Sequence, residues 1–236
     1  MEVKLGERPV SALFDPASVA VVGASEDPRK WGNWLAQGAL RGESHRPAYL
    51  INHRAGTTVL GRRAYRSLDD LPEVPDLVVI AVPAVAVDSA VDGALAAGSR
   101  AIVIITAGGH DQDAGLAERV RAAGAVLLGP NCLGVLDAGR RLELVPNPLP
   151  GGAIGLISQS GNLALELGLL AAAEGLGFSR FASLGNQADL DATDLIAEFA
   201  RHDATELIAL YLEDFRDGRA FARAAAAAVR AGKPVV

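Results

Sequence analysis

The sequence SVAVVGAS, residues 18–25, decides the fold of this chain. Its small and β-branched residues end at Gly23, and a polar stretch then leads into the helical pattern of residues 31–41. Continuous hydrophobicity is typical of a strand that is covered on both faces of a parallel sheet. Gly23 lets the backbone turn sharply after that strand. The stretch therefore predicts the strand–turn–helix unit that opens a doubly wound α/β domain.

The same alternation continues towards the C-terminus. Further strands are expected at residues 48–51, 77–82, 101–106 and 125–128, with helices at 84–97 and 113–123. The segment VPNPLPGG, residues 145–152, is rich in proline and glycine and predicts a domain boundary. Beyond it, strands are expected at 153–158, 179–184 and 207–212, and helices at 162–174, 191–201 and 217–231. We expect a Rossmann-like domain over residues 1–147 and a second α/β domain over residues 150–236. The second domain looks incomplete, because KPVV at its end resembles the start of another strand.

Composition narrows the class of protein. A net charge of −6, with no basic block, argues against a nucleic-acid-binding surface. The single cysteine, Cys132, excludes a disulfide framework and a cysteine-rich zinc site. The apolar runs are far shorter than the ~20 residues that span a bilayer, and the N-terminus has no apolar signal region. We therefore expect a soluble, cytoplasmic protein with no membrane partner.

The turn after the first strand is suited to an anion, because the following helix offers unpaired N–H groups. The dinucleotide fingerprint G-x-G-x-x-G is absent, since Ser25 and Pro28 replace its second and third glycines. The second strand ends in Asn52-His53-Arg54 rather than in the acid that holds the ribose of NAD. Neutral and basic groups there favour a phosphorylated ribose, as in NADP or coenzyme A, and Arg29 and Lys30 add charge for a pyrophosphate. Each basic residue taken singly could equally be ordinary surface.

Several short motifs together resemble one enzyme family. They are VGAS at 22–25, IAVP at 80–83, GPNCLG at 129–134 and ISQSG at 157–161, with FDP at 14–16 and SLGN at 183–186 in support. In this order they resemble the CoA-binding part of the ADP-forming acyl-CoA synthetases, relatives of the succinyl-CoA synthetase α subunit. The resemblance covers residues 12–236. It implies a CoA-binding Rossmann-like domain followed by a flavodoxin-like domain of the succinyl-CoA synthetase type.

The resemblance also implies, position by position, which residues contact coenzyme A. They are Gly23, Ala24, Ser25 and Arg29 at its phosphates, Asn52 and Arg54 at the ribose phosphate, Val82 and Pro83 at the adenine or its ribose, Thr106 and Ala107 along the pantetheine, and Asn131 at the thiol end.

In the second domain the resemblance implies a phosphate site. Ser158, Gln159, Ser160 and Gly161 occupy a predicted strand-to-helix turn, where hydroxyls and a helix N-terminus could hold phosphate or phosphohistidine. The alternative is an ordinary serine N-cap. The resemblance assigns Gly185 and Asn186 to the same pocket. It also assigns Glu213 to the carboxylate that orients the catalytic histidine, and the alternative is a solvated loop acid.

The family interconverts acyl-CoA, phosphate and ADP with a small carboxylic acid, CoA and ATP through a phosphohistidine. Its histidine normally follows a K-P-V-V strand, which is where this sequence ends, and His45, His53, His110 and His202 do not match it. We expect the chain to bind CoA without completing the reaction. ATP, ADP and Mg²⁺ would be handled by an ATP-grasp domain or β subunit.

Alternatives remain at this point. One is a CoA- or acyl-CoA-sensing module of a larger protein such as an acetyltransferase, and another is an NADP-dependent oxidoreductase. Cys132 is either a covalent acyl or disulfide carrier beside the CoA thiol or, as is commoner for a free cysteine, a small buried residue. Asn186, Gln187 and Asp189 are candidates for shaping the acyl pocket, but they do not identify the acyl group.

Overall fold

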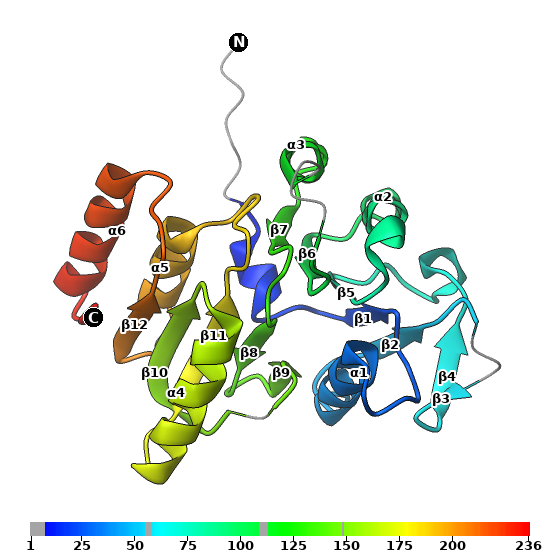
Figure 1. Ribbon diagram of the computed structural model, residues 1–236, viewed down its shortest axis with the longest axis horizontal. Coiled ribbons are helices and arrows are strands. Elements are labelled where there is room, and N and C mark those ends of the chain that lie inside the picture. The colour runs from blue at the N-terminus through cyan, green and yellow to red at the C-terminus, as the bar shows by residue number, and fades with distance from the viewer. Residues whose placement is uncertain (1–7, 55–57, 109–112, 148) are drawn as a thin grey trace.

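The computed structural model describes residues 8–54, 58–108, 113–147 and 149–236 (Figure 1). Its N-terminal half contains a seven-stranded sheet in the order β3-β4-β2-β1-β5-β6-β7. All neighbouring strands in this order are parallel except β3 and β4, which are antiparallel. The strands are β1 (Val19–Val22), β2 (Ala48–Ile51), β3 (Thr58–Val59), β4 (Arg62–Tyr65), β5 (Leu77–Ile80), β6 (Ala101–Ile104) and β7 (Val126–Leu128).

Helices cover both faces of this sheet, as the continuous hydrophobicity of its strands predicts. Helix α1 (Trp31–Arg41) lies on one face, and α2 (Val87–Ala97) and α3 (Asp113–Ala122) lie on the other (Figure 1). Alternate residues of β5 belong to different buried clusters: Leu77 and Val79 to one, Val78 and Ile80 to the other. The predicted doubly wound arrangement is confirmed. Short 3-10 turns are η1 (Val10–Leu13), η2 (Leu68–Asp70) and η3 (Ala84–Ala86).

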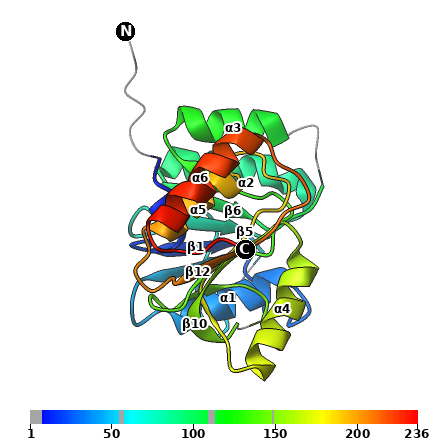
Figure 2. The ribbon, with the colours of Figure 1, turned by 90° about the vertical axis from the view of Figure 1, so that its left-hand side faces the viewer.

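The C-terminal half forms a five-stranded sheet in the order β12-β10-β11-β8-β9. Strands β10, β11 and β12 are parallel, whereas β8 and β9 form an antiparallel hairpin against β11. Helix α4 covers one face, and α5 and α6 cover the other (Figure 2). The elements are β8 (Val135–Asp137), β9 (Leu142–Leu144), β10 (Gly151–Ser158), α4 (Gly161–Ala173), β11 (Phe178–Ser183), α5 (Ala192–Ala200), β12 (Leu207–Tyr211) and α6 (Gly218–Arg230).

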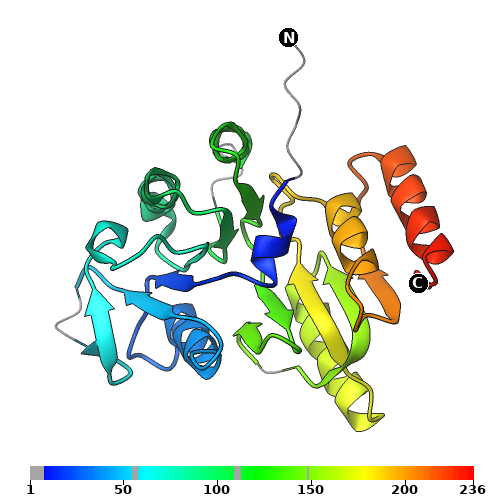
Figure 3. The same cartoon turned by 180° about the vertical axis from the view of Figure 1, so that it is seen from behind.

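The two halves share one buried core. Turn η1 lies between the two sheets (Figure 3), and the Phe14 ring that follows it meets Phe199 of α5 edge to face, with 5.2 Å between ring centroids. The buried carboxylate of Asp189 joins the halves again. It accepts hydrogen bonds from Arg8, from Arg121 Nε at 2.5 Å and from the Leu127 N–H at 2.9 Å. The halves are therefore held in a fixed relation by packing and by charge.

Two hairpins were not expected from the sequence. The hairpin β3–β4 occupies part of the polar connection after β2, and β8–β9 precedes the predicted boundary yet pairs with the second sheet. A boundary near residues 147–150 stays a prediction, and the structure places Val135–Leu144 with the second sheet. At the C-terminus, Val235 forms a parallel bridge to Ile208, where KPVV predicts a strand. Among the described residues, no helix combines the length and apolarity needed to cross a bilayer.

Candidate functional site

A cavity of about 930 Å³ lies at the carboxyl ends of β1, β5 and β6 and extends to the start of α4. This edge of a doubly wound sheet is where ligands bind in such folds. Ten of the residues predicted from sequence line it: Gly23, Arg29, Val82, Thr106, Ala107, Asn131, Gln159, Ser160, Gly161 and Glu213. The fold thus brings residues of both predicted sites to one cavity. Ala24, Ser25, Asn52, Arg54, Pro83, Ser158, Gly185 and Asn186 are not among its lining residues.

The turn at Gly23 is packed too closely for a side chain. Gly23 has φ +96°, and a Cβ there would lie 2.3 Å from the Ala81 carbonyl oxygen. A Cβ on Gly32, the second residue of α1, would lie 1.9 Å from the Gly23 carbonyl oxygen. The N–H groups of Gly23 and Ala24 both donate to Ile51 O, at 2.9 and 3.0 Å. An anion at this turn would therefore rely on the N-terminus of α1 rather than on these two N–H groups.

The N-terminus of α1 has the features of an anion site. Lys30 occupies the N-cap position without a side-chain capping bond, and Lys30, Trp31 and Gly32 all line the cavity. The helix dipole and the lysine charge both favour a phosphate here. Arg29 also lines the cavity, but its side chain is 87% exposed and is already paired with the Asp27 carboxylate through two hydrogen bonds of 3.0 Å. Those bonds from Arg29 lower the pKa of Asp27 to about 2.

Ala24, Ser25 and Asn52, which are predicted to contact CoA, form hydrogen bonds within the turn. Asn52 donates from Nδ2 to Ala24 O at 2.7 Å, and its Oδ1 accepts the Arg54 N–H at 2.9 Å. Ala24 is fully buried, and Ser25 Oγ accepts the Asp27 N–H at 3.1 Å. Both the nitrogen and the oxygen of the Asn52 side-chain amide are thus hydrogen-bonded to backbone groups. Arg54 is exposed beyond β2 and donates from Nε to His53 Nε2 at 3.2 Å.

The segment after β7 forms the floor of the cavity. Asn131 follows a cis Gly129–Pro130 peptide and has φ +58°, and its N–H donates to Thr106 O at 3.0 Å. Thr106 donates in turn from Oγ1 to Val82 O at 2.6 Å. These bonds join the ends of three neighbouring strands into one surface. Asn131 Nδ2 donates to Asn186 Oδ1 at 3.2 Å, which links the floor to the second half.

Cys132 lines the cavity but has the environment of a core residue. It is 5% exposed, and its thiol donates to Ile104 O at 3.2 Å. Burial raises the pKa of the thiol to about 12. Because the thiolate is the reactive form, this favours the interpretation of Cys132 as a small buried residue over that of a covalent carrier.

The start of α4 forms the opposite end of the cavity. Ser160 is the N-cap, and its Oγ accepts the Leu163 N–H at 3.3 Å, while Gly161 is the first helical residue. Ser158 is buried and donates from Oγ to Ser160 O at 2.6 Å, which stabilises the turn between β10 and α4. The cap interpretation of Ser160 and the phosphate interpretation are compatible, because the cavity still meets the helix N-terminus.

Neighbouring loops hold this helix start in place. Gly185, at φ +58°, is packed on the first half, where a Cβ would lie 2.2 Å from Pro130 O. The Asn186 N–H donates to the same oxygen at 2.9 Å. Gln159 accepts the Glu213 N–H at 2.8 Å and donates to Asp214 Oδ1 at 2.8 Å. Gln159 therefore positions the turn that brings the exposed Glu213 to the cavity.

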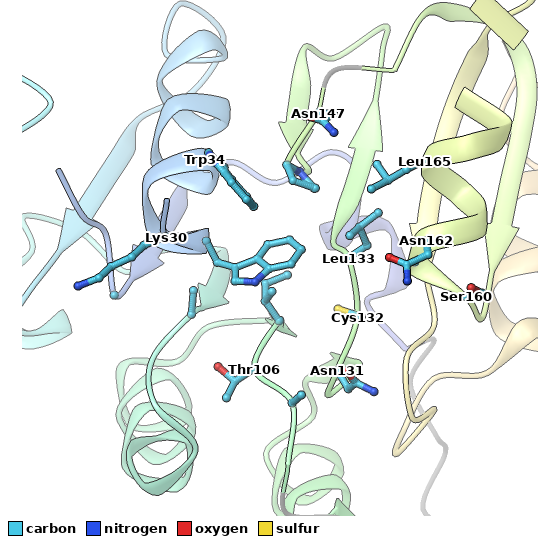
Figure 4. A pocket seen from close by; sticks show the side chains of 18 of the residues that line it. Lys30, Trp34, Thr106, Asn131, Cys132, Leu133, Asn147, Ser160, Asn162 and Leu165 are labelled. Atoms are coloured by element: carbon cyan, nitrogen blue, oxygen red, sulfur yellow. The ribbon is translucent and has the colours of Figure 1, made fainter. Parts of the chain in front are cut away.

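Sequence reasoning missed the apolar wall of the cavity. Its members are Trp31 and Trp34 of α1, Leu133 and Pro146 of the connecting segments, and Leu165 of α4. Figure 4 shows Trp34 facing Leu133 and Leu165 across the cavity, with Asn147 at its edge. The sequence does contain an indication of this apolar wall, because its two tryptophans, Trp31 and Trp34, both lie in the helix that follows the first turn.

Comparison with known proteins finds two domain families along the chain. Residues 17–138 match the model of the CoA binding domain, and residues 151–236 match that of the succinyl-CoA ligase like flavodoxin domain. The chain is 34% identical over 232 residues to the acetate–CoA ligase [ADP-forming] II subunit alpha of Pyrococcus furiosus, which covers 95% of this chain and 50% of that protein. It is 36% identical to the acetate–CoA ligase [ADP-forming] I of Archaeoglobus fulgidus, over 95% of this chain and 33% of that protein.

Solved structures of similar proteins have the same fold as this chain. The Candidatus Korarchaeum cryptofilum dinucleotide forming acetyl-coenzyme A synthetase 1, in complex with phosphate and ADP, superposes with a TM-score of 0.90 at 34% identity. The match covers 96% of this chain and 50% of that one. The chain thus spans half or less of the length of these relatives.

Proposed function

The chain belongs to the family of CoA-binding domains, continued by a succinyl-CoA ligase-like domain, and from this premise we propose that it is the CoA-binding α part of an ADP-forming acid–CoA ligase. The parent reaction would interconvert acyl-CoA, phosphate and ADP with a carboxylic acid, CoA and ATP. One observation carries the proposal: a single cavity connects the N-terminus of α1 with the N-terminus of α4. The two phosphate-bearing reactants, CoA and inorganic phosphate, thereby gain separate anion sites that face each other.

Coenzyme A would enter from the first half. Its pyrophosphate would bind at the start of α1 beside Lys30, where the helix dipole and the lysine charge act together. Its pantetheine would pass over Val82 and Thr106 towards Asn131, because these residues line the cavity in that spatial order along the strand ends. Arg54, exposed beyond β2, is the cation that we assign to the 3′-phosphate. Asn52 would act indirectly, by fixing the turn.

Phosphate would bind at the start of α4. The N–H groups of this helix start and the Ser160 hydroxyl can hold it next to the thioester carbon above Asn131. A phosphate oxygen would attack the acyl carbon and CoA would leave as its thiolate, giving an acyl phosphate. Preorganised N–H donors would stabilise the charge of the attacked carbonyl in this step.

The remaining steps require groups from elsewhere. None of the described histidines, His45, His53 or His202, lines the cavity, so the phosphohistidine would come from another part of the protein. We propose an ATP-grasp partner, as a domain or a β subunit, that brings ATP, ADP and Mg²⁺, and a cytoplasmic location. Glu213 would face the incoming histidine. None of the relatives described above is a regulatory protein or an oxidoreductase, so neither alternative gains support.

Calorimetric titration of the chain with CoA, dephospho-CoA and NADPH tests the proposal. We expect CoA to bind, dephospho-CoA to bind about tenfold more weakly because one charge-assisted phosphate contact is lost, and NADPH not to compete. Lys30→Gln weakens CoA binding by a similar factor, whereas the control Arg230→Gln, at the far end of α6, leaves it unchanged. A chain that ignores CoA at millimolar concentration contradicts the proposal.

A further inference from the structure

We propose that Asp214 is a positioning residue for the phosphate end of the cavity, and that Gln187 assists it. Neither residue is among those that line the cavity, so both act through neighbours that do. This inference rests on the proposed function, because the group that is positioned is the start of α4, where we place inorganic phosphate. It names residues outside the cavity on which the binding of that phosphate depends.

The Asp214 carboxylate joins the loops that follow three neighbouring strands. Its Oδ1 accepts hydrogen bonds from Gln159 Nε2 at 2.8 Å and from Gln187 Nε2 at 2.9 Å. Gln159 follows β10, Gln187 lies in the loop after β11, and Asp214 itself lies in the loop after β12. These strands are adjacent and parallel, so their carboxyl ends lie at one edge of the sheet. One oxygen atom therefore connects three loops that are far apart in the sequence.

The contact with Asp214 fixes the Gln159 side chain at both ends of its amide. While Nε2 donates to Asp214, Oε1 accepts the N–H groups of Glu213 and Asp214, at 2.8 and 3.3 Å. Gln159 comes directly before Ser160, the N-cap of α4. A fixed Gln159 therefore holds the N–H groups of this helix start in one arrangement. Donors that are already in place bind an anion without an additional cost of ordering.

Gln187 is held in a backbone conformation that a residue with a Cβ rarely adopts. Its φ is +52°, and the residue is only 5% exposed. Such conformations persist where the surrounding contacts hold them, and here the Gln187 carbonyl oxygen also accepts a bond from Arg216 Nη1 at 2.7 Å. The preceding residue, Asn186, donates its N–H to Pro130 O at 2.9 Å. Through Gln187, Asp214 is thus connected to the loop that rests on the floor of the cavity.

Charge and position lead to opposite expectations for Asp214. A carboxylate close to a phosphate repels it, so a purely electrostatic role predicts that removing the charge strengthens phosphate binding. A positioning role predicts that removing the acceptor weakens binding, because Gln159 then loses a contact that fixes the start of α4. Asp214→Asn separates the two roles, since it removes the charge and keeps a carbonyl oxygen that can accept both amide N–H groups.

Titration of the chain with inorganic phosphate, followed by phosphorus NMR, tests this inference. We expect Asp214→Ala to weaken phosphate binding about fivefold, which corresponds to the net contribution of one to two hydrogen bonds. Gln187→Ala weakens it in the same direction, and Asp214→Asn binds phosphate at least as tightly as the unmodified chain. The double variant of Asp214→Ala with Gln187→Ala is no weaker than Asp214→Ala alone, because both substitutions remove the same contact.

Controls exclude a general loss of structure. Asp203→Ala removes an exposed carboxylate from the turn before β12, outside the cavity, and leaves phosphate binding unchanged. Asp214→Ala keeps the affinity for free CoA of the unmodified chain, and Gln187→Ala carries the same test if Asp214→Ala does not fold. Phosphate binding by these variants that equals or exceeds that of the unmodified chain overturns this inference alone. Failure of the unmodified chain to bind phosphate overturns the proposed phosphate site as well.

Discussion

At the scale of single residues, the site depends on close backbone contacts that only glycine permits. Gly23 and Gly32 let the first turn and α1 approach to a distance that excludes a Cβ on either. Asn52 and Asn33 then fix the turn by donating to Ala24 O and Ser25 O, at 2.7 and 2.8 Å. These contacts create the position of the α1 N-terminus at which we place the CoA pyrophosphate.

Gly23→Ala is expected to destabilise the chain by about 3 kcal/mol or more, because strain at positive φ adds to a clash with Ala81 O. Gly61→Ala is the matched control: Gly61 also has positive φ, +70°, but a Cβ there meets nothing within 4 Å. It should cost only the strain, about 1–2 kcal/mol. Urea unfolding of both variants measures the difference, and equal losses would show that crowding at Gly23 is unimportant.

Cys132 is expected to react slowly with iodoacetamide. Its raised pKa of about 12 lowers the thiolate fraction at pH 8 about a thousandfold relative to an ordinary cysteine, with pKa ~8.5. Since the pKa is higher in the folded than in the unfolded chain, the contribution to stability is complete below pH ~8.5 and is lost as the pH rises towards 12. Mass spectrometry of native and urea-unfolded chain compares the alkylation rates. Rapid labelling of the native thiol would instead support Cys132 as a covalent acyl or disulfide carrier.

At the scale of elements, sequence patterns located the long helices and strands within two residues of their observed ends, except that α2 begins three residues later than predicted, after the turn η3. They missed β3–β4 and β8–β9, because short segments such as RRAY in β4 and LEL in β9 contain charged residues and lack the continuous hydrophobicity that identified the parallel strands. They also selected loops that line the cavity, since carboxyl ends of parallel strands share one edge. Trp34 and Leu165 could not be paired in advance, because only the packing of the two halves brings α1 opposite α4.

Ser160 offers a test that separates a cap from a ligand. Ser160→Asp keeps a side-chain oxygen at the N-cap of α4, so the free energy of unfolding should change by less than about 0.5 kcal/mol. The added negative charge should weaken binding of inorganic phosphate about tenfold. Asp191→Ser exchanges the same two residue types at the N-cap of α5 and should leave phosphate binding unchanged. Undiminished phosphate binding to Ser160→Asp would reduce Ser160 to a structural cap.

At the scale of the whole molecule, the shared core couples the two halves. The ring contact of Phe14 with Phe199 and the bonds to Asp189 cross between them. We expect a single cooperative unfolding transition in urea, with tryptophan fluorescence of the first half and far-UV circular dichroism of both halves coinciding. Two separated transitions would show that the halves fold independently.

Asp189→Asn should destabilise this assembly by about 2–4 kcal/mol, because Arg8 and Arg121 lose a buried acceptor of opposite charge. Asp203→Asn, on an exposed turn of the same half, serves as the control and should change stability by less than about 0.5 kcal/mol. Thermal or urea denaturation provides the comparison. A small effect of Asp189→Asn would assign the joining of the halves to apolar packing alone.

The position of η1 between the sheets has a kinetic consequence. With that turn buried on both sides, the walls of the cavity cannot swing apart like the lobes of a hinged receptor. We therefore expect association with CoA, followed by stopped-flow fluorescence, to be a single exponential whose rate constant rises linearly with ligand concentration. Discrimination between thioesters would then reside in how long each stays bound rather than in how fast it enters.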